Sequence, residues 1–172
     1  MDIRDVLIDG IDQLTEWTDD ALDGLSADQL NWLADGKTVS IGFNAWHMMR
    51  TSDNITNFVF QKRQPIWLRE NYLEKFGLPK VEQGTGMALE TARDLKVSDP
   101  TLLRQYGRAV HADVVKFLKN VSDAELAEVQ MIKPLGEMPK WRVVRQVLMT
   151  HGFMHLGEMN VLRGMIGLQF SI

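Results

Sequence analysis

The chain has 172 residues, of which 45% are hydrophobic and 24% charged, and its formal net charge is −4. Such values are typical of one globular domain covering residues 1–172, and they argue against disorder and against a general attraction to nucleic acid. The sequence contains no cysteine, which excludes disulfides, thiolate ligands and a cysteine nucleophile. We find no signal-peptide pattern and no apolar run long enough to span a membrane, so we expect a cytoplasmic protein.

The first expected helix covers residues 2–23, and Gly24 stands where it would end. Apolar or small side chains recur there at steps of three and four residues, which places them on one helix face. They are Ile3, Leu7, Ile11, Leu14, Thr18 and Ala21. A polar connector from Ser26 to Thr38 follows this helix.

The second expected helix runs from Ser40, a suitable N-cap, to about Arg63, before Pro65. Its apolar residues occupy an unusually wide arc of the helix surface. An arc of this width predicts burial on more than one side, either within a helix bundle or partly against a second subunit.

Residues 65–97 show a less regular pattern, interrupted by Gly77, Pro79, Gly84 and Gly86. We expect an excursion between helices that contains one or two short helical turns. A connection of this length is expected to have a task, such as covering a pocket or a dimer face.

The third expected helix covers residues 99–120, with Asp99 as N-cap and Pro100 in the first helical position. A connector over residues 122–138 leads to a fourth helix over residues 139–165. We find no convincing strand pattern. The expected fold is therefore all-α, an antiparallel four-helix bundle with a partly helical excursion between its second and third helices.

The fourth helix carries polar residues where apolar ones are expected. A stripe with alternating steps of four and three residues is typical of the inward seam of a bundle helix. Its members are Val144, Leu148, His151, His155, Glu158, Leu162 and Met165. Three consecutive seam positions are thus His, His and Glu, and polar groups in a core are costly unless something satisfies them.

A divalent metal ion would satisfy these groups. His151 and His155 are four residues apart, so their rings lie on the same helix face and can bind one ion. A third ligand must come from a neighbouring helix, and His47 lies near the start of the buried second helix. Glu158 is a candidate fourth ligand, a base, or an outer partner that holds an imidazole tautomer.

A purely structural role is the competing interpretation of these residues, because a core histidine is often only hydrogen-bonded. We give this interpretation to His111, which is expected to be partly exposed. Arg50, one turn beyond His47, is a candidate contact for an anionic substrate or, equally, a solvated surface side chain.

Three segments of the chain resemble motifs of the DinB superfamily, also called the DinB/YfiT-like metalloenzymes. The stretch from Ser40 to Met48 resembles the second-helix motif, in which a histidine follows an aromatic-rich run. The stretch from His151 to Glu158 resembles the fourth-helix motif, H-x-x-x-H followed by glycine. The stretch from Gly24 to Trp32 resembles the connector after the first helix, and the resemblance covers nearly the whole chain.

The resemblance implies a four-helix bundle in up-down-down-up order, commonly dimeric, with metal ligands from helices two and four. Those ligands correspond to His47, His151 and His155, while Glu158 departs from the glutamine that is frequent in the family. Characterised relatives include thiol transferases that use bacillithiol and a mycothiol-dependent maleylpyruvate isomerase.

The leading functional hypothesis is an enzyme that uses a divalent metal, zinc first and nickel next, to activate a low-molecular-weight thiol for transfer to an electrophilic small molecule. The thiol must be a separate small molecule, because the chain has no cysteine. In this scheme Glu158 would accept a proton. The alternative is a non-catalytic, metal-binding or stress-related protein with a structural or vestigial site. A nucleic-acid partner is not expected, and a homodimer is.

Overall fold

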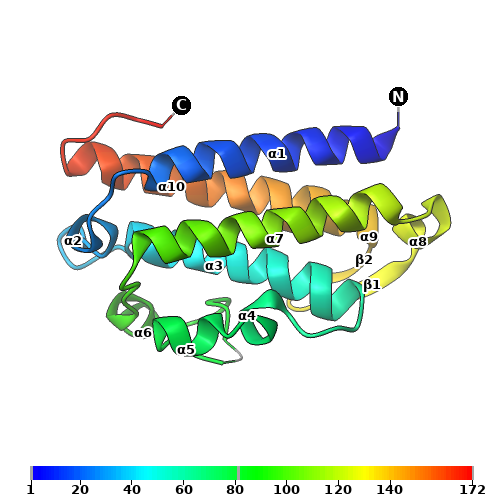
Figure 1. The fold of residues 1–172 in the computed structure, drawn as a ribbon, viewed down its shortest axis with the longest axis horizontal. Coiled ribbons are helices and arrows are strands. Elements are labelled where there is room, and N and C mark those ends of the chain that lie inside the picture. The colour runs from blue at the N-terminus through cyan, green and yellow to red at the C-terminus, as the bar shows by residue number, and fades with distance from the viewer. Residues whose placement is uncertain (1, 81, 172) are drawn as a thin grey trace.

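The computed structural model describes residues 2–80 and 82–171. Four long helical segments pack side by side in it (Figure 1). In chain order they are α1 (Ile3–Leu22), α3 (Ile41–Asp53) with the π-helical turn η1 (Asn54–Phe60), α7 (Pro100–Asn120), and α9 (Lys140–Val143) with the π-helical turn η2 (Val144–Thr150) and α10 (His151–Met165).

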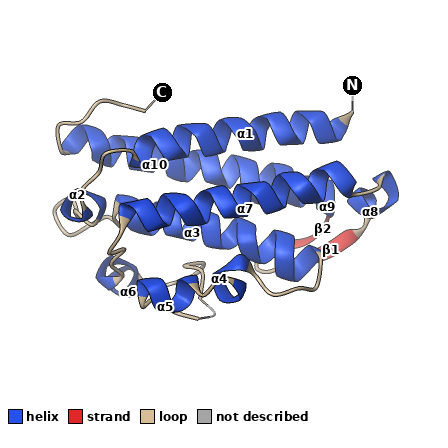
Figure 2. Cartoon of the chain, in the orientation of Figure 1, coloured by secondary structure: helices blue, strands red, loops and turns tan. Residues whose placement is uncertain are grey.

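Helix α1 packs against α7 and α10, and α3 packs against the same two helices. Helices dominate the structure, and strands are confined to one short stretch near α8 (Figure 2). The predicted all-α class is therefore confirmed, while the up-down-down-up order of the helices stays a prediction. No helix in residues 2–80 and 82–171 combines the length and the apolar character that crossing a membrane requires.

The predicted helix starts agree with the structure. Ser40 caps α3 by accepting a hydrogen bond from the Phe43 backbone N–H, and Asp99 caps α7 by accepting one from Leu102. Pro100 occupies the first turn of α7, where its missing N–H would have no helical partner. These caps fix where the long helices begin, and so which residues of α3 lie opposite α10.

The described part of the excursion, residues 65–80 and 82–97, contains three short helices, one more than the sequence suggested. They are α4 (Ile66–Arg69), α5 (Tyr72–Phe76) and α6 (Leu89–Asp94). Figure 1 shows them as a layer beside α3 and α7. Two further short helices, α2 (Ala27–Leu30) and α8 (Asp123–Ala127), lie in the connectors.

The sequence analysis missed a β-hairpin in the connector before the fourth helix. Strands β1 (Val129–Ile132) and β2 (Gly136–Pro139) pair antiparallel, with Val129 opposite Pro139. Each strand has only four residues, and in β1 only Ile132 is buried. Four residues are too few for an alternating pattern to stand out from a polar loop.

Helix α3 is enclosed by its own chain. Every residue from 41 to 50 is buried, and α3 packs against α2, α4, α7 and α10. Most of the wide apolar arc therefore reflects burial within this chain, although Phe58 in η1 is 58% exposed. The homodimer expected from the sequence stays a prediction.

The seam assigned to the fourth helix is wrong in its second half. Val144, Leu148 and Leu162 are buried, but Glu158 and Met165 are exposed. The buried stripe of α10 runs instead through Gly152, Leu156, Met159 and Leu162. His151 and His155 are half-buried and stand one position before Gly152 and Leu156, at the edge of the core rather than in its centre.

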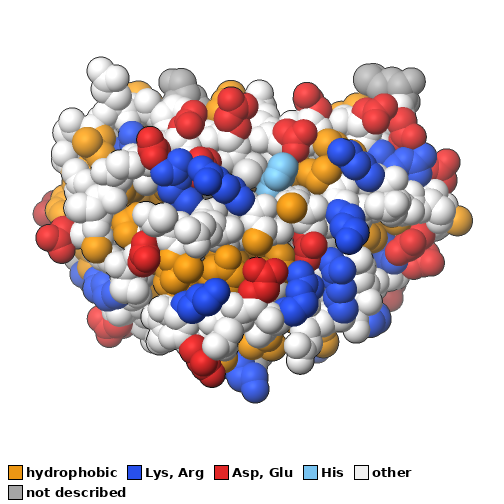
Figure 3. Space-filling model, viewed as in Figure 1, with side chains coloured by type: hydrophobic (Ala, Val, Ile, Leu, Met, Phe, Trp, Pro, Cys, Tyr) orange, Lys and Arg blue, Asp and Glu red, His pale blue; other side chains and the backbone are white. Residues whose placement is uncertain are grey.

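Ion pairs join α1 to α7 on the face shown in Figure 3, where acidic and basic side chains lie close together. Arg104 donates two hydrogen bonds to Asp19, at 2.9 and 2.7 Å, and Arg108 donates a third at 2.8 Å. The bonds from Arg104, ahead of those from Arg108, lower the pKa of Asp19 to about 2. This carboxylate is part of the contact between the two helices.

Candidate metal centre

His47 lies in the second turn of α3, with only 7% of its surface exposed. Its Nδ1 is hydrogen-bonded to the backbone carbonyl of Gln83, from the segment before α6. A carbonyl oxygen can only accept a hydrogen bond, so Nδ1 carries the proton of the neutral ring. The Nε2 of His47 is then a bare lone pair that points toward α10.

His155 has the same arrangement on the opposite side. Its Nδ1 contacts Asn44 Oδ1 at 3.1 Å and Glu158 Oε2 at 2.9 Å. Both partners are acceptors, so the proton of His155 resides on Nδ1 and its Nε2 is also a lone pair. Two elements, α3 and α10, thus fix the tautomer of this ring.

The three rings meet through their Nε2 atoms. His151 Nε2 lies 3.1 Å from His47 Nε2 and 3.0 Å from His155 Nε2. A proton on His151 Nε2 can point at only one of these neighbours, which leaves the other lone pair without a donor. Imidazole nitrogens bound to one tetrahedral ion at 2.0–2.1 Å would lie about 3.3 Å apart. The donor set therefore fits a divalent cation.

The electrostatics keep the rings in the form that binds metal. Burial, helped by the neighbouring His155 and His47 rings, lowers the pKa of His151 to about 4. Burial also lowers the pKa of His47, although the Gln83 carbonyl opposes this effect. Both rings are neutral at pH 7, and only a neutral imidazole can bind a metal ion through its lone pair.

The backbone of residues 83–84 closes the site over His47. A Cβ atom at Gly84 would lie 2.7 Å from His47 Nδ1 and 3.1 Å from Phe43 Cζ, and the φ of Gly84 is +95°. Only glycine allows this backbone both its conformation and its closeness to the ring. The sequence marked Gly84 merely as a helix breaker, because nothing in the pattern showed which side chain it would face.

Glu158 stands outside the group of converging nitrogens. Its side chain is 55% exposed and contacts the Nδ1 face of His155. Of the three roles open from the sequence, this geometry supports an outer partner that orients an imidazole. A role in proton transfer remains open to it, because its carboxylate reaches solvent.

The interpretation of Arg50 as a solvated surface side chain is wrong, because this residue is 2% exposed, while its contact with an anionic substrate stays a prediction. Its Nη1 lies 3.8 Å from Asp53 Oδ2, and its guanidinium lies 4.8 Å from the centre of the Trp67 ring. His111, by contrast, agrees with the prediction: it is partly exposed and pairs with Asp12 at 2.6 Å.

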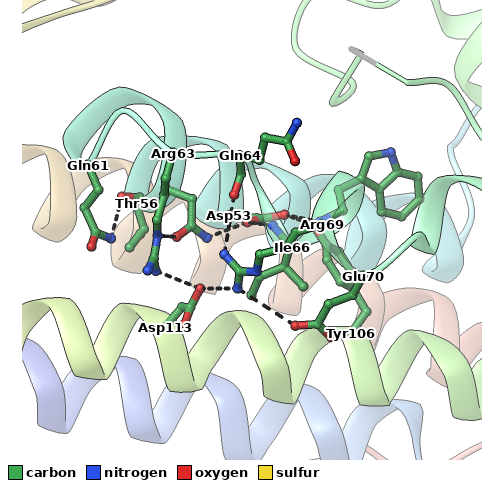
Figure 4. A network of polar contacts seen from close by, with 12 residues as sticks. Asp53, Thr56, Gln61, Arg63, Gln64, Ile66, Arg69, Glu70, Tyr106 and Asp113 are labelled. Atoms are coloured by element: carbon green, nitrogen blue, oxygen red, sulfur yellow. Dashed lines mark hydrogen bonds and ion pairs between the residues drawn. The ribbon is translucent and has the colours of Figure 1, made fainter.

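Asp53 organises a polar network that the sequence analysis missed (Figure 4). Its Oδ1 accepts hydrogen bonds from the Ile66 N–H and Asn57 Nδ2, and its Oδ2 accepts from the Trp67 N–H and the Tyr106 hydroxyl, all at 2.7–2.9 Å. Burial, and then the Asp53 charge, raise the pKa of Tyr106, so its hydroxyl remains a donor. This network attaches α4 to α3 and α7.

Comparison with known proteins agrees with this fold. A family model for the DinB superfamily matches residues 11–159. A crystal structure of a conserved protein from Enterococcus faecalis is 21% identical and superposes with a TM-score of 0.84, over 97% of this chain and 99% of that one. At this identity the likeness shows the fold alone. No curated protein matches the sequence.

Proposed function

The chain belongs to the DinB superfamily, and we propose that it is a metal-dependent enzyme whose divalent cation is held by His47, His151 and His155. The observation that carries this proposal is the convergence of three Nε2 atoms within 4.8 Å of one another. Two of these atoms are fixed as lone pairs by their Nδ1 partners. Zinc is the first candidate and nickel the second, since imidazole suits both.

Three neutral imidazoles leave coordination positions open, which is typical of a catalytic rather than a structural site. When bound there, a divalent cation lowers the pKa of a water or thiol that it binds. We propose a small thiol as the nucleophile, since the chain itself supplies none. The three rings would orient this thiol at the edge of the core, where the half-buried position of His151 and His155 leaves room for a second substrate.

In the proposed transfer, the thiol sulfur forms a bond to an electrophilic carbon of the second substrate. The bond from that carbon to its leaving group breaks, and the leaving group takes the electron pair. The proton of the thiol reaches Glu158 through water, because its exposed carboxylate lies 2.9 Å from His155 Nδ1, across the ring from the converging Nε2 atoms. From there the proton can pass to solvent or to the leaving group.

Turnover tests this proposal. Zinc- or nickel-loaded protein would be assayed for conjugation of cysteine or glutathione to monochlorobimane, before and after chelation. We expect chelator-sensitive turnover in the wild type, retained by His111→Ala and lost in His155→Ala. His111 is the matched control because it is a histidine paired with Asp12, outside the three-ring group.

Loss of stability on chelation, with no turnover for any thiol tested, would overturn the enzymatic proposal and favour a structural ion.

A homodimer is a separate proposal, supported by exposed apolar side chains on α10 such as Met154. Gel filtration at micromolar concentration would test it, and a stable monomer would contradict it.

A further inference from the structure

A cavity of about 360 Å³ lies on the Nδ1 side of His155, between the start of α3 and the second half of α10. Its volume falls within the range of small-molecule sites. Asn44 and Glu158 form the part of its wall nearest the site, and both contact Nδ1 of His155. The cavity therefore begins at the residues that orient a proposed metal ligand.

From this point the cavity extends away from the histidines. Along α10 its wall continues from Glu158 through Leu162 to Met165. On the opposite side it continues from Asn44 to the segment before Ser40, which contains Lys37. Helices α3 and α10 pack together and run in opposite directions (Figure 1). Seven residues of helix span about 10 Å, so Lys37 lies at the far end of an elongated cavity.

The polarity and charge of the cavity wall change along this length. Most of the side chains beyond Glu158 are apolar, among them Leu89, Val161 and Met165. The single cation among the lining residues is Lys37, which is exposed and can turn its ammonium group toward the cavity mouth. The single lining carboxylate, Glu158, is hydrogen-bonded to His155 at the other end. An anionic group is thus favoured at the Lys37 end and disfavoured at the Glu158 end.

From this polarity we infer that the second substrate of the proposed enzyme is a small amphiphilic anion, with an apolar body and a terminal carboxylate. Only the placement of the substrate's electrophilic end rests on the proposed function. The apolar body lies along α10 beside Val161 and Leu162, and the carboxylate pairs with Lys37. The opposite end, which carries the electrophilic carbon, lies beside His155.

Calorimetric titration of the full-length protein with octanoate tests this assignment. The titration uses chelated protein, because a carboxylate could otherwise bind the metal ion itself. We expect saturable binding that is about five-fold weaker in Lys37→Met, as expected for loss of one exposed charge pair. Lys119→Met, which removes an exposed lysine on α7, is the matched control and should bind octanoate like the wild type.

Octan-1-ol, with the same chain length and no charge, should bind equally to the wild type and to Lys37→Met. Val161→Glu should abolish octanoate binding, because it places a carboxylate on the apolar wall; Val161 is 60% exposed, so this variant should fold. Equal octanoate affinity in the wild type and Lys37→Met, or no saturable binding, would overturn the assignment. Because no metal is present in this titration, its failure would leave the metal site and the turnover assay unaffected.

Discussion

Helix α3 contributes a central residue to each of two polar clusters, Asp53 to one and His47 to the other. The clusters differ in what their lone pairs contact. Around Asp53 every carboxylate oxygen accepts hydrogen bonds from backbone or side-chain donors of the protein. Around His47, six residues earlier, three ring nitrogens face one another, and at most one of them can carry a proton toward a neighbour.

The difference separates a structural cluster from a binding site. A buried polar group whose hydrogen-bond partners all belong to the protein stabilises one conformation and needs no external ligand. Lone pairs that converge without a protein donor need an added partner, which a proton, a water molecule or a cation can supply. Burial disfavours the proton, as the lowered pKa of His151 shows, and so keeps that ring in the neutral form that can bind a cation.

Removing the Asp53 carboxylate, both of whose oxygens accept hydrogen bonds, should have the largest effect on stability. Asp53→Ala leaves buried donors and the Arg50 charge without a partner, and should lower the free energy of unfolding by about 3–5 kcal/mol in urea titrations. Tyr106→Phe removes a single donor and should cost about 1 kcal/mol, so it provides a folded variant. Metal affinity should be unchanged in Tyr106→Phe. A clear loss of affinity there would mean that the two clusters are not independent.

Displacing the His47 ring without mutating any of the three histidines should have an intermediate effect, this time on metal affinity. Gly84→Ala places a methyl group against His47 and should weaken metal binding by about 10–100-fold, measured by competition with a chromophoric chelator. Gly86→Ala is the matched control, since Gly86 also has a positive φ, +73°, but has no atom within 4 Å of its added Cβ. Gly86→Ala should lose about 1 kcal/mol of stability through its backbone conformation alone, and Gly84→Ala should lose more, because its added methyl group also meets His47 and Phe43. Equal metal affinity in the two would contradict the role of residues 83–84.

Asp19, in the α1–α7 ion pair, is a second carboxylate whose hydrogen bonds come from the protein, but it is partly exposed. Its removal should therefore lower stability the least of these changes. The pKa of Asp19 is lowered to about 2, so its stabilisation is complete above about pH 4 and is lost as the pH falls toward 2. Asp19→Asn should therefore cost about 1–2 kcal/mol at pH 7, after allowance for solvent screening. This difference from the wild type should shrink to a small fraction near pH 2 and vanish below it.

Asp9→Asn, an exposed aspartate on the same helix, provides the comparison for that pH series. Its unfolding free energy should stay close to that of the wild type at pH 7. If Asp19→Asn gave the same small effect as Asp9→Asn, the contact with Arg104 would contribute nothing to stability.

The sequence predicted what depends on local pattern. Periodicity located the four long helices, and side-chain chemistry located the caps at Ser40 and Asp99. The i, i+4 spacing of His151 and His155 placed both rings on one face of a helix, and His47 was the remaining histidine in a buried setting. The structure brings these three rings together.

What the sequence could not give depends on contacts across long separations in the chain. In the sequence Asp53 is an ordinary polar residue, and its role appears only when α4 packs onto α3. Gly84 is likewise an ordinary helix breaker, and its role appears only when its backbone lies against His47. The seam of the fourth helix was misplaced near Glu158 because a stripe of alternating steps does not show which of its edges faces solvent. The hairpin strands were too short to carry a readable period.

Metal titration of His47→Ala beside His111→Ala tests the central claim most directly. The account predicts one zinc ion per chain in the wild type and in His111→Ala, and an affinity lower by more than about 100-fold in His47→Ala. Metal-free His47→Ala should meanwhile unfold at nearly the same urea concentration as the metal-free wild type. Equal zinc affinity in all three proteins, or no bound ion in the wild type, would contradict the claim.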